Sequence, residues 1–114
     1  MSIVLNQPAL EYARRLLDDE QYAINTVWEH NAPTEEQSSA YKAMHGEAAF
    51  KLWYLAIERD ANGNAIYMLP YGDFRKLHRS GVVAAYKRAI QLNAADVAAG
   101  ARELLDLLDR MNAC

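Results

Sequence analysis

The chain has 114 residues, of which 52% are hydrophobic, and 12 Lys or Arg against 15 Asp or Glu give a formal net charge of −3. This length suits one domain spanning residues 1–114, and the apolar fraction is too high for a disordered chain. The longest apolar runs fall far short of the ~18 residues that a membrane span requires, and the single Cys114 excludes an intrachain disulfide. Because the N-terminal residues also lack the pattern of a secretory signal, we expect a folded cytoplasmic protein with no membrane partner.

The first predicted helix runs from about Pro8 to His30. Proline is favoured in the first turn of a helix, and apolar residues follow at spacings of three, four and seven: Leu10, Ala13, Leu17, Ile24 and Val27. Three consecutive acids at 18–20 interrupt this stripe, and adjacent like charges repel. We expect one helix with a kink or a break at the acids.

A second helix is predicted to start at Thr34 and to continue to about residue 59. Thr34 and Gln37 have the spacing of a capping box, and the turn-forming run 60–64 follows the helix. From Ala48 onward the sequence is apolar on every side of a helix. Four residues lie nearly opposite its main stripe: Phe50, Trp53, Tyr54 and Ile57. Such a helix is either central in its own domain or buried against a partner, and both interpretations stay open.

Residues 65–69 are rich in side chains that favour strands and are followed by Pro70. They form either a short strand or a loop that packs on the helices. The only plausible strand partner is Ile3–Leu5, and a two-stranded ribbon from these pieces needs helix packing for stability.

Two further helices complete the prediction. The third begins at Asp73 as N-cap and ends near Leu92, and the fourth runs from the capping segment 93–96 to about Met111. The short link between them requires a tight helical hairpin. The predicted fold is therefore mostly α, a single-domain bundle of about four helices with a short extended segment between the second and third.

Basic residues gather in the third predicted helix. Residues 65–93 hold five basic side chains against Asp73 alone, giving +4 in an otherwise acidic chain. At 100° per residue, one outer face carries Arg75, Lys76, Arg79, Tyr86 and Lys87. This face suits the phosphates of a nucleic acid, with Tyr86 available for stacking, although a solvated or internally paired face is the simpler interpretation.

No motif for catalysis, a metal or a cofactor is recognisable. The histidines have no second ligand at helical spacing, and the run 60–64 departs from a calcium loop because its glycine falls at position four. His45 and His78 are the only natural candidates for proton transfer, and a hydrogen-bonded structural imidazole is the commoner role. We expect no catalytic residue, no cofactor and no metal.

The favoured hypothesis is a small non-catalytic interaction or regulatory protein that associates with itself or with another protein. The interface would be built on Phe50, Trp53, Tyr54 and Ile57, because aromatic side chains dominate such contacts. The alternative hypothesis is a nucleic-acid-associated protein that uses the basic face of the third helix.

Overall fold

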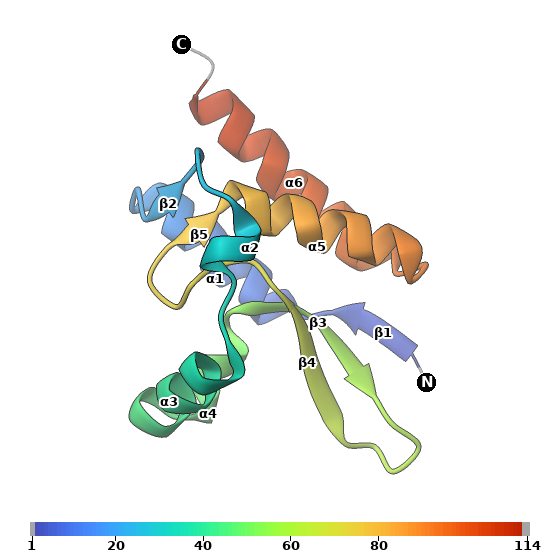
Figure 1. The fold of residues 1–114 in the computed structure, drawn as a ribbon. Helices are drawn as coiled ribbons and strands as arrows, with labels where there is room; N and C mark the ends of the chain where they lie inside the picture. The colour runs from blue at the N-terminus through green and yellow to red at the C-terminus, as the bar shows by residue number, and fades with distance from the viewer. Residues whose placement is uncertain (1, 113–114) are drawn as a thin grey trace.

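The computed structural model describes residues 2–112, and these form six helices and five strands (Figure 1). The strands are β1 (Ser2–Leu5), β2 (Tyr22–Ala23), β3 (Tyr54–Arg59), β4 (Ala65–Pro70) and β5 (Leu77–His78). The helices are α1 (Gln7–Asp18), α2 (Trp28–Asn31), α3 (Glu35–His45), α4 (Glu47–Lys51), α5 (Arg79–Gln91) and α6 (Ala95–Met111).

The central sheet is antiparallel with the strand order β1-β3-β4, and β2 and β5 form a separate parallel pair. Helices α1, α5 and α6 lie together on one side of the sheet (Figure 1). Leu5 approaches Gly100 of α6, so the cross-strand row of Leu5, Ala56 and Met68 faces these helices. The row of Val4, Ile57 and Tyr67 therefore faces the opposite side.

The hydrophobic core lies where the helices meet β3. Helix α6 contributes seven buried residues and α1 contributes five. Among the largest fully buried side chains are Trp53, Tyr71, Leu17, Leu104 and Leu108. One cluster of buried residues thus joins the three longest helices, α1, α5 and α6, to the sheet.

The predicted four-helix bundle is wrong, because the second predicted helix does not continue to residue 59. It stops at His45, where Gly46 has φ 89, a backbone conformation that favours glycine. The short helix α4 follows, and the chain then becomes the central strand β3. A run that is apolar on every side is also typical of a strand covered on both faces, and that pattern produced the error.

Two buried polar side chains define the turn between α4 and β3. The Nδ2 atom of Asn6 donates to the backbone oxygens of Lys51 and Tyr54, both at 2.9 Å. The hydroxyl of Tyr71 donates to the backbone oxygen of Leu52 at 2.7 Å. These carbonyls would accept backbone amides in a continuous helix, so the side chains replace the helical hydrogen bonds and allow the chain to turn.

Three other predicted elements also differ from the structure. The chain breaks at the acids, as the sequence allowed, with the first helix ending at Asp18 and Glu20 at φ 58, but residues 19–27 do not continue the helix. The third helix begins at Arg79, because residues 72–77 form a tight loop closed by a bridge between Gly72 and Leu77. Segments 3–5 and 65–69 are both extended, but β3 lies between them and the ribbon does not form.

Two predicted details are confirmed. Thr34 Oγ1 accepts the Gln37 amide while the Gln37 side chain accepts the Thr34 amide, which completes the capping box. Helices α5 and α6 are joined by a short link in which Asn93 has φ 56. Within residues 2–112, no helix is both long enough and apolar enough to cross a membrane.

The first prediction concerns Asn6, which is 4% exposed. Asn6→Ala should lower the free energy of unfolding by about 2–4 kcal/mol, because it leaves one buried and one partly buried carbonyl without their donor. Urea denaturation measures the loss. Asn112→Ala is the control: it removes an amide hydrogen bond to Leu108 at the end of α6 and should cost less than about 1 kcal/mol. Equal losses in the two variants would contradict the role assigned to Asn6.

Candidate functional site

Helices α3 and α4 form an arm that projects from the rest of the molecule (Figure 1). Neither helix contains a buried residue, and Met44 on α3 is 78% exposed. Helices of 11 and five residues are marginal in water on their own. The arm therefore depends on a few contacts with the rest of the chain, which we call the body.

A cluster of aromatic rings makes those contacts. Phe74 stacks on Tyr41 of α3 with ring centroids 4.4 Å apart and planes inclined by 11°. Phe74 also lies 6.2 Å from Phe50 of α4 and 5.8 Å from the buried Trp53. The indole Nε1 of Trp53 donates to the Tyr41 hydroxyl at 3.2 Å. Phe74 thus sits at the centre of the arm's attachment.

The loop 72–77 holds Phe74 in a strained conformation. Phe74 has φ 68, which costs a bulky residue free energy and persists only where the surroundings enforce it. The Oδ1 atom of Asp73 accepts the amides of Arg75 at 3.0 Å and Lys76 at 2.8 Å. At Gly72 a Cβ atom would lie 2.6 Å from the Trp53 ring, so the loop also requires glycine for close packing.

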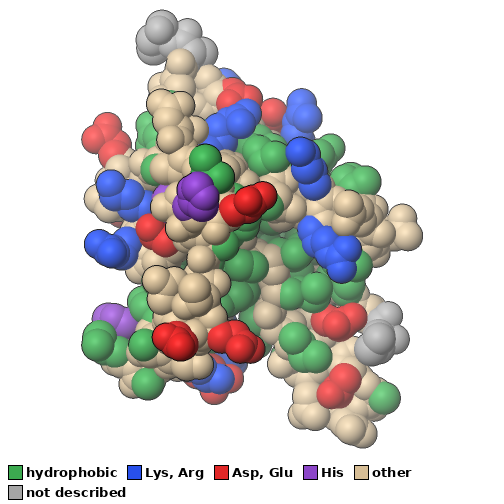
Figure 2. Space-filling model, in the orientation of Figure 1, with side chains coloured by type: hydrophobic (Ala, Val, Ile, Leu, Met, Phe, Trp, Pro, Cys, Tyr) green, Lys and Arg blue, Asp and Glu red, His purple; other side chains and the backbone are tan. Residues whose placement is uncertain are grey.

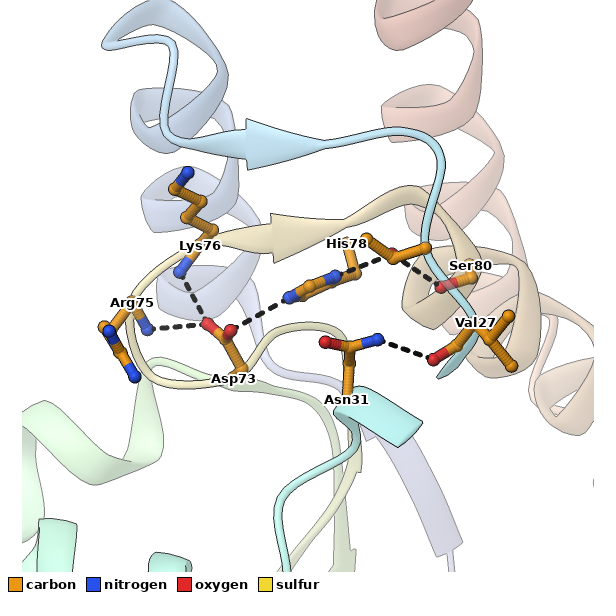
Figure 3. A network of polar contacts seen from close by, with 8 residues as sticks. Val27, Asn31, Asp73, Arg75, Lys76, His78 and Ser80 are labelled. Atoms are coloured by element: carbon orange, nitrogen blue, oxygen red, sulfur yellow. Dashed lines mark hydrogen bonds and ion pairs between the residues drawn. The ribbon is translucent and has the colours of Figure 1, made fainter. Parts of the chain in front are cut away.

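Figure 3 shows how the loop is tied to the segment before α2. His78 Nε2 lies 3.0 Å from Asp73 Oδ2, although the contact is poorly aligned for a hydrogen bond. On the other side of the ring, Nδ1 lies 2.8 Å from Thr26 Oγ1, which in turn lies 3.4 Å from Ser80 Oγ. With Nε2 protonated toward the carboxylate, Nδ1 accepts the hydrogen of the Thr26 hydroxyl.

This Asp–His–hydroxyl order is also the order of acyl-transfer sites. Here, however, the imidazole is 3% exposed and both nitrogens already face protein groups. Burial raises the pKa of Asp73, but the amides of Lys76 and Arg75 and the contact with His78 outweigh it and leave the pKa below its ordinary value. The network therefore serves best to fix the loop and, through Phe74, the arm.

The arm carries an open groove with a volume of about 760 Å³. Its lining consists of Glu35, Glu36, Ser38, Ser39, Lys42 and Phe50. The Lys42 ammonium lies 5.4 Å from the centre of the Phe50 ring, a cation–π contact along the groove. Figure 2 shows acidic side chains on the surface of the lobe that α3 and α4 form.

The structure separates the four residues predicted for an interface. Trp53 and Tyr54 are 2% and 7% exposed and belong to the core of the chain. Phe50 is half-buried and lines the groove, and Ile57 is half-buried on the sheet face that the long helices leave open. Their joint role at an interface stays a prediction, but only Phe50 lies in the groove.

The structure also separates the five residues predicted for a basic face. Arg75 and Lys76 are exposed in the loop 72–77, ahead of α5, so the common helix face is wrong. Arg79 pairs with Asp109 at 3.2 Å, and Tyr86 packs partly against the core. Lys87 is exposed on α5. Nucleic-acid binding through these residues stays a prediction.

Sequence reasoning missed Tyr41 and Phe74 as the joint of the arm, and Thr26 as a partner of His78. Helical spacing of the neighbouring apolar residues places Phe74 inside the third predicted helix, which the structure contradicts. The turn-forming pair Gly72–Asp73 was the available signal for a loop, since Asp often caps a tight turn through its own side chain.

The 60–64 turn is closed by its own hydrogen bonds. At the 60–64 turn, Asp60 Oδ1 accepts the amides of Asn62 and Asn64 at 2.9 Å, as a turn requires, and these hydrogen bonds lower the pKa of Asp60. Within residues 2–112, no group of His, Cys, Asp and Glu could hold a metal ion. Cys114 lies outside the described residues.

No protein-family model matches the chain, and comparison with curated proteins and with solved structures gave no match. The site is therefore interpreted from its own geometry.

The second prediction concerns the attachment of the arm. Phe74→Ala should speed amide hydrogen exchange over residues 35–51 by about tenfold, because each lost aromatic contact is worth about 0.5–1.5 kcal/mol beyond its buried area. Exchange in α6 should change little. Phe74→Tyr, which keeps the ring, is the control. Faster exchange throughout the chain would show that Phe74 stabilises the body and not the arm.

The third prediction concerns the pH dependence that Asp73 causes. Because its pKa is lowered on folding, its stabilising effect is present above its ordinary value of 3.8 and disappears as the pH falls through the lowered value. Asp73→Asn should cost roughly 1–2 kcal/mol at neutral pH, and this difference should shrink below about pH 4. Denaturation curves over acidic and neutral pH measure it.

The control for Asp73 is an exposed carboxylate. Asp106→Asn removes a surface ion pair with Arg102 and should cost less than about 1 kcal/mol at any pH. A difference between Asp73→Asn and the unmodified protein that stays constant with pH would contradict the third prediction.

Proposed function

We propose that the protein is a small non-catalytic interaction protein that docks its partner in the groove of the arm. One observation carries this proposal: helices α3 and α4 contain no buried residue, yet they are held in place by the loop 72–77. That loop has a strained backbone at Phe74 and is fixed by hydrogen bonds to the Asp73 carboxylate. Strain of this kind persists only where other contacts offset it, and it concentrates at functional sites. A positioned groove is what this arrangement provides.

The composition of the groove supports a protein partner. Phe50 supplies an aromatic surface, and the remaining lining is charged or hydroxylic. An aromatic anchor with a polar surround is typical of protein interfaces. Of the four interface residues expected from the sequence, the proposal retains Phe50. It adds the α3 residues that line the groove with Phe50.

The environment of His78 supports a role without catalysis. Both ring nitrogens contact side chains of the chain itself, and the groove does not include the imidazole. We place the protein in the cytoplasm, a compartment that suits a chain with a single cysteine.

The fourth prediction tests the groove by peptide selection, which does not require the partner to be identified. Selection of random displayed peptides on the immobilised protein should enrich sequences whose affinity falls at least about tenfold for Phe50→Ala, as expected for an interface anchor. Fluorescence anisotropy of the selected peptides measures the affinity. Amide exchange of Phe50→Ala establishes that the arm is still folded.

Ile90→Ala is the matched control, because Ile90 is a large side chain on α5 that is 54% exposed and lies outside the groove. It should leave peptide affinity unchanged. Peptides that bind the protein but lose equal affinity in both variants, or that are unaffected by Phe50→Ala, would overturn the proposed function.

A further inference from the structure

We propose that the groove of one chain docks the loop 72–77 of a second copy, with Arg75 and Lys76 of the loop facing Glu35 and Glu36 of the groove. This inference rests on the proposed function, because it assigns an occupant to the same groove. It makes the protein a dimer whose two contacts are related by a twofold axis.

The acidic half of this contact has no basic partner in its own chain. Glu35 and Glu36 are exposed and line the groove, and within residues 2–112 neither has a basic nitrogen within 4.0 Å. Other acids nearby do not share this property, since Glu47 pairs with Lys51 at 3.7 Å. The groove therefore presents two carboxylates that form no ion pair, while its one basic side chain, Lys42, lies over the Phe50 ring.

The basic half is displayed by a rigid element. Arg75 and Lys76 are exposed, and neither side chain forms an ion pair in the described part of the chain. Their amides are fixed on the Asp73 carboxylate, which is itself held beside His78 (Figure 3). A backbone that is ordered before binding loses little entropy on docking, so this loop is better prepared than a flexible chain end.

The two halves match in size and chemistry. The open groove, with a volume of about 760 Å³, has room for the two side chains. A guanidinium pairs well with carboxylates, and the carboxylates of Glu35 and Glu36 line the groove. Because each chain carries a groove and a loop, a twofold axis forms the contact twice.

A second exposed basic pair provides a matched comparison. Lys87 and Arg88 are adjacent on α5 and form no ion pair among residues 2–112. They lie on a regular helix, where Arg88 is hydrogen-bonded to Gln91 at 3.0 Å. Arg75 and Lys76, by contrast, are the exposed residues of a tight turn closed by the bridge between Gly72 and Leu77. The proposal therefore assigns docking to Arg75 and Lys76 and no role to Lys87 and Arg88.

Sedimentation equilibrium of the full chain tests the proposal. At low salt we expect a reversible monomer–dimer equilibrium that weakens at least about tenfold at about 1 M salt, where the screening length falls to about 3 Å. Reversal of either charged pair, Glu35→Lys with Glu36→Lys or Arg75→Glu with Lys76→Glu, should weaken dimerisation at least about tenfold, because like charges then face each other. The variant with all four substitutions should dimerise again.

Matched reversals elsewhere complete the design. Lys87→Glu with Arg88→Glu changes the net charge by the same amount as reversal of the loop pair. Asp19→Lys with Glu20→Lys changes it by the same amount as reversal of the groove pair. Neither control should alter dimerisation. Circular dichroism establishes that each variant is folded. Because acids in the first turn stabilise α3, the neutral pair Glu35→Gln with Glu36→Gln is measured as well and should also weaken the dimer.

The outcomes separate this inference from the proposed function. Docking of a second copy is overturned if the chain is a monomer at every concentration or forms a dimer that is insensitive to salt. It is also overturned if only one of the two charge reversals weakens the dimer, or if the variant with all four substitutions does not dimerise again. In each case, peptides selected on the groove and lost with Phe50→Ala would still support the proposed function. Failure of the peptide selection alone, with both reversals still weakening the dimer, would support a second copy as the occupant of the groove and overturn the binding of other partners there.

Discussion

The fold depends on how the backbone carbonyls at residues 51, 52 and 54 find their donors. In a continuous helix these carbonyls would accept backbone amides, and the helix would continue past Trp53. Instead the side chains of Asn6 and Tyr71 donate to them. Both donors are buried, so the turn depends on the segments before α1 and after β4 being packed against it. A local choice between helix and strand is thereby decided by residues 19 to 48 positions away.

This dependence explains which parts of the fold the sequence could predict. The capping box at Thr34 and the hairpin of α5 and α6 are local, since their signals lie within a few residues. The strand β3 is not local, because Tyr54, Leu55 and Ala56 are buried in succession and fit a buried helix or a central strand equally well. Gly46 was the one local sign that the helix ends early, and it becomes decisive only through its positive φ, which the fold imposes.

The candidate site was less predictable for the same reason. Phe50 could be identified as an aromatic side chain in an unusual position, but its neighbours in the groove come from the preceding helix. The network around His78 joins residues 26, 73, 78 and 80. The periodicity of the sequence assigns each of these residues to an element, but it does not predict which of them are in contact. The sequence places His78 beside an apolar stripe, but only the fold brings its partners to it.

The core carries most of the buried surface, and the arm carries the groove to which we assign the proposed function. The core around α6 and β3 buries large apolar side chains, and changes there act on the whole fold. The arm buries none and is held through Phe74, whose strained backbone depends on Asp73 and on Trp53 beneath Gly72. Elements of low local stability can open or shift without global unfolding. A partner in the groove would stabilise the arm, and through Tyr41 and Phe74 it would also stabilise the loop that carries Arg75 and Lys76. In a dimer that exchanges loop and groove, each docking event would therefore further stabilise the already ordered loop used for the other.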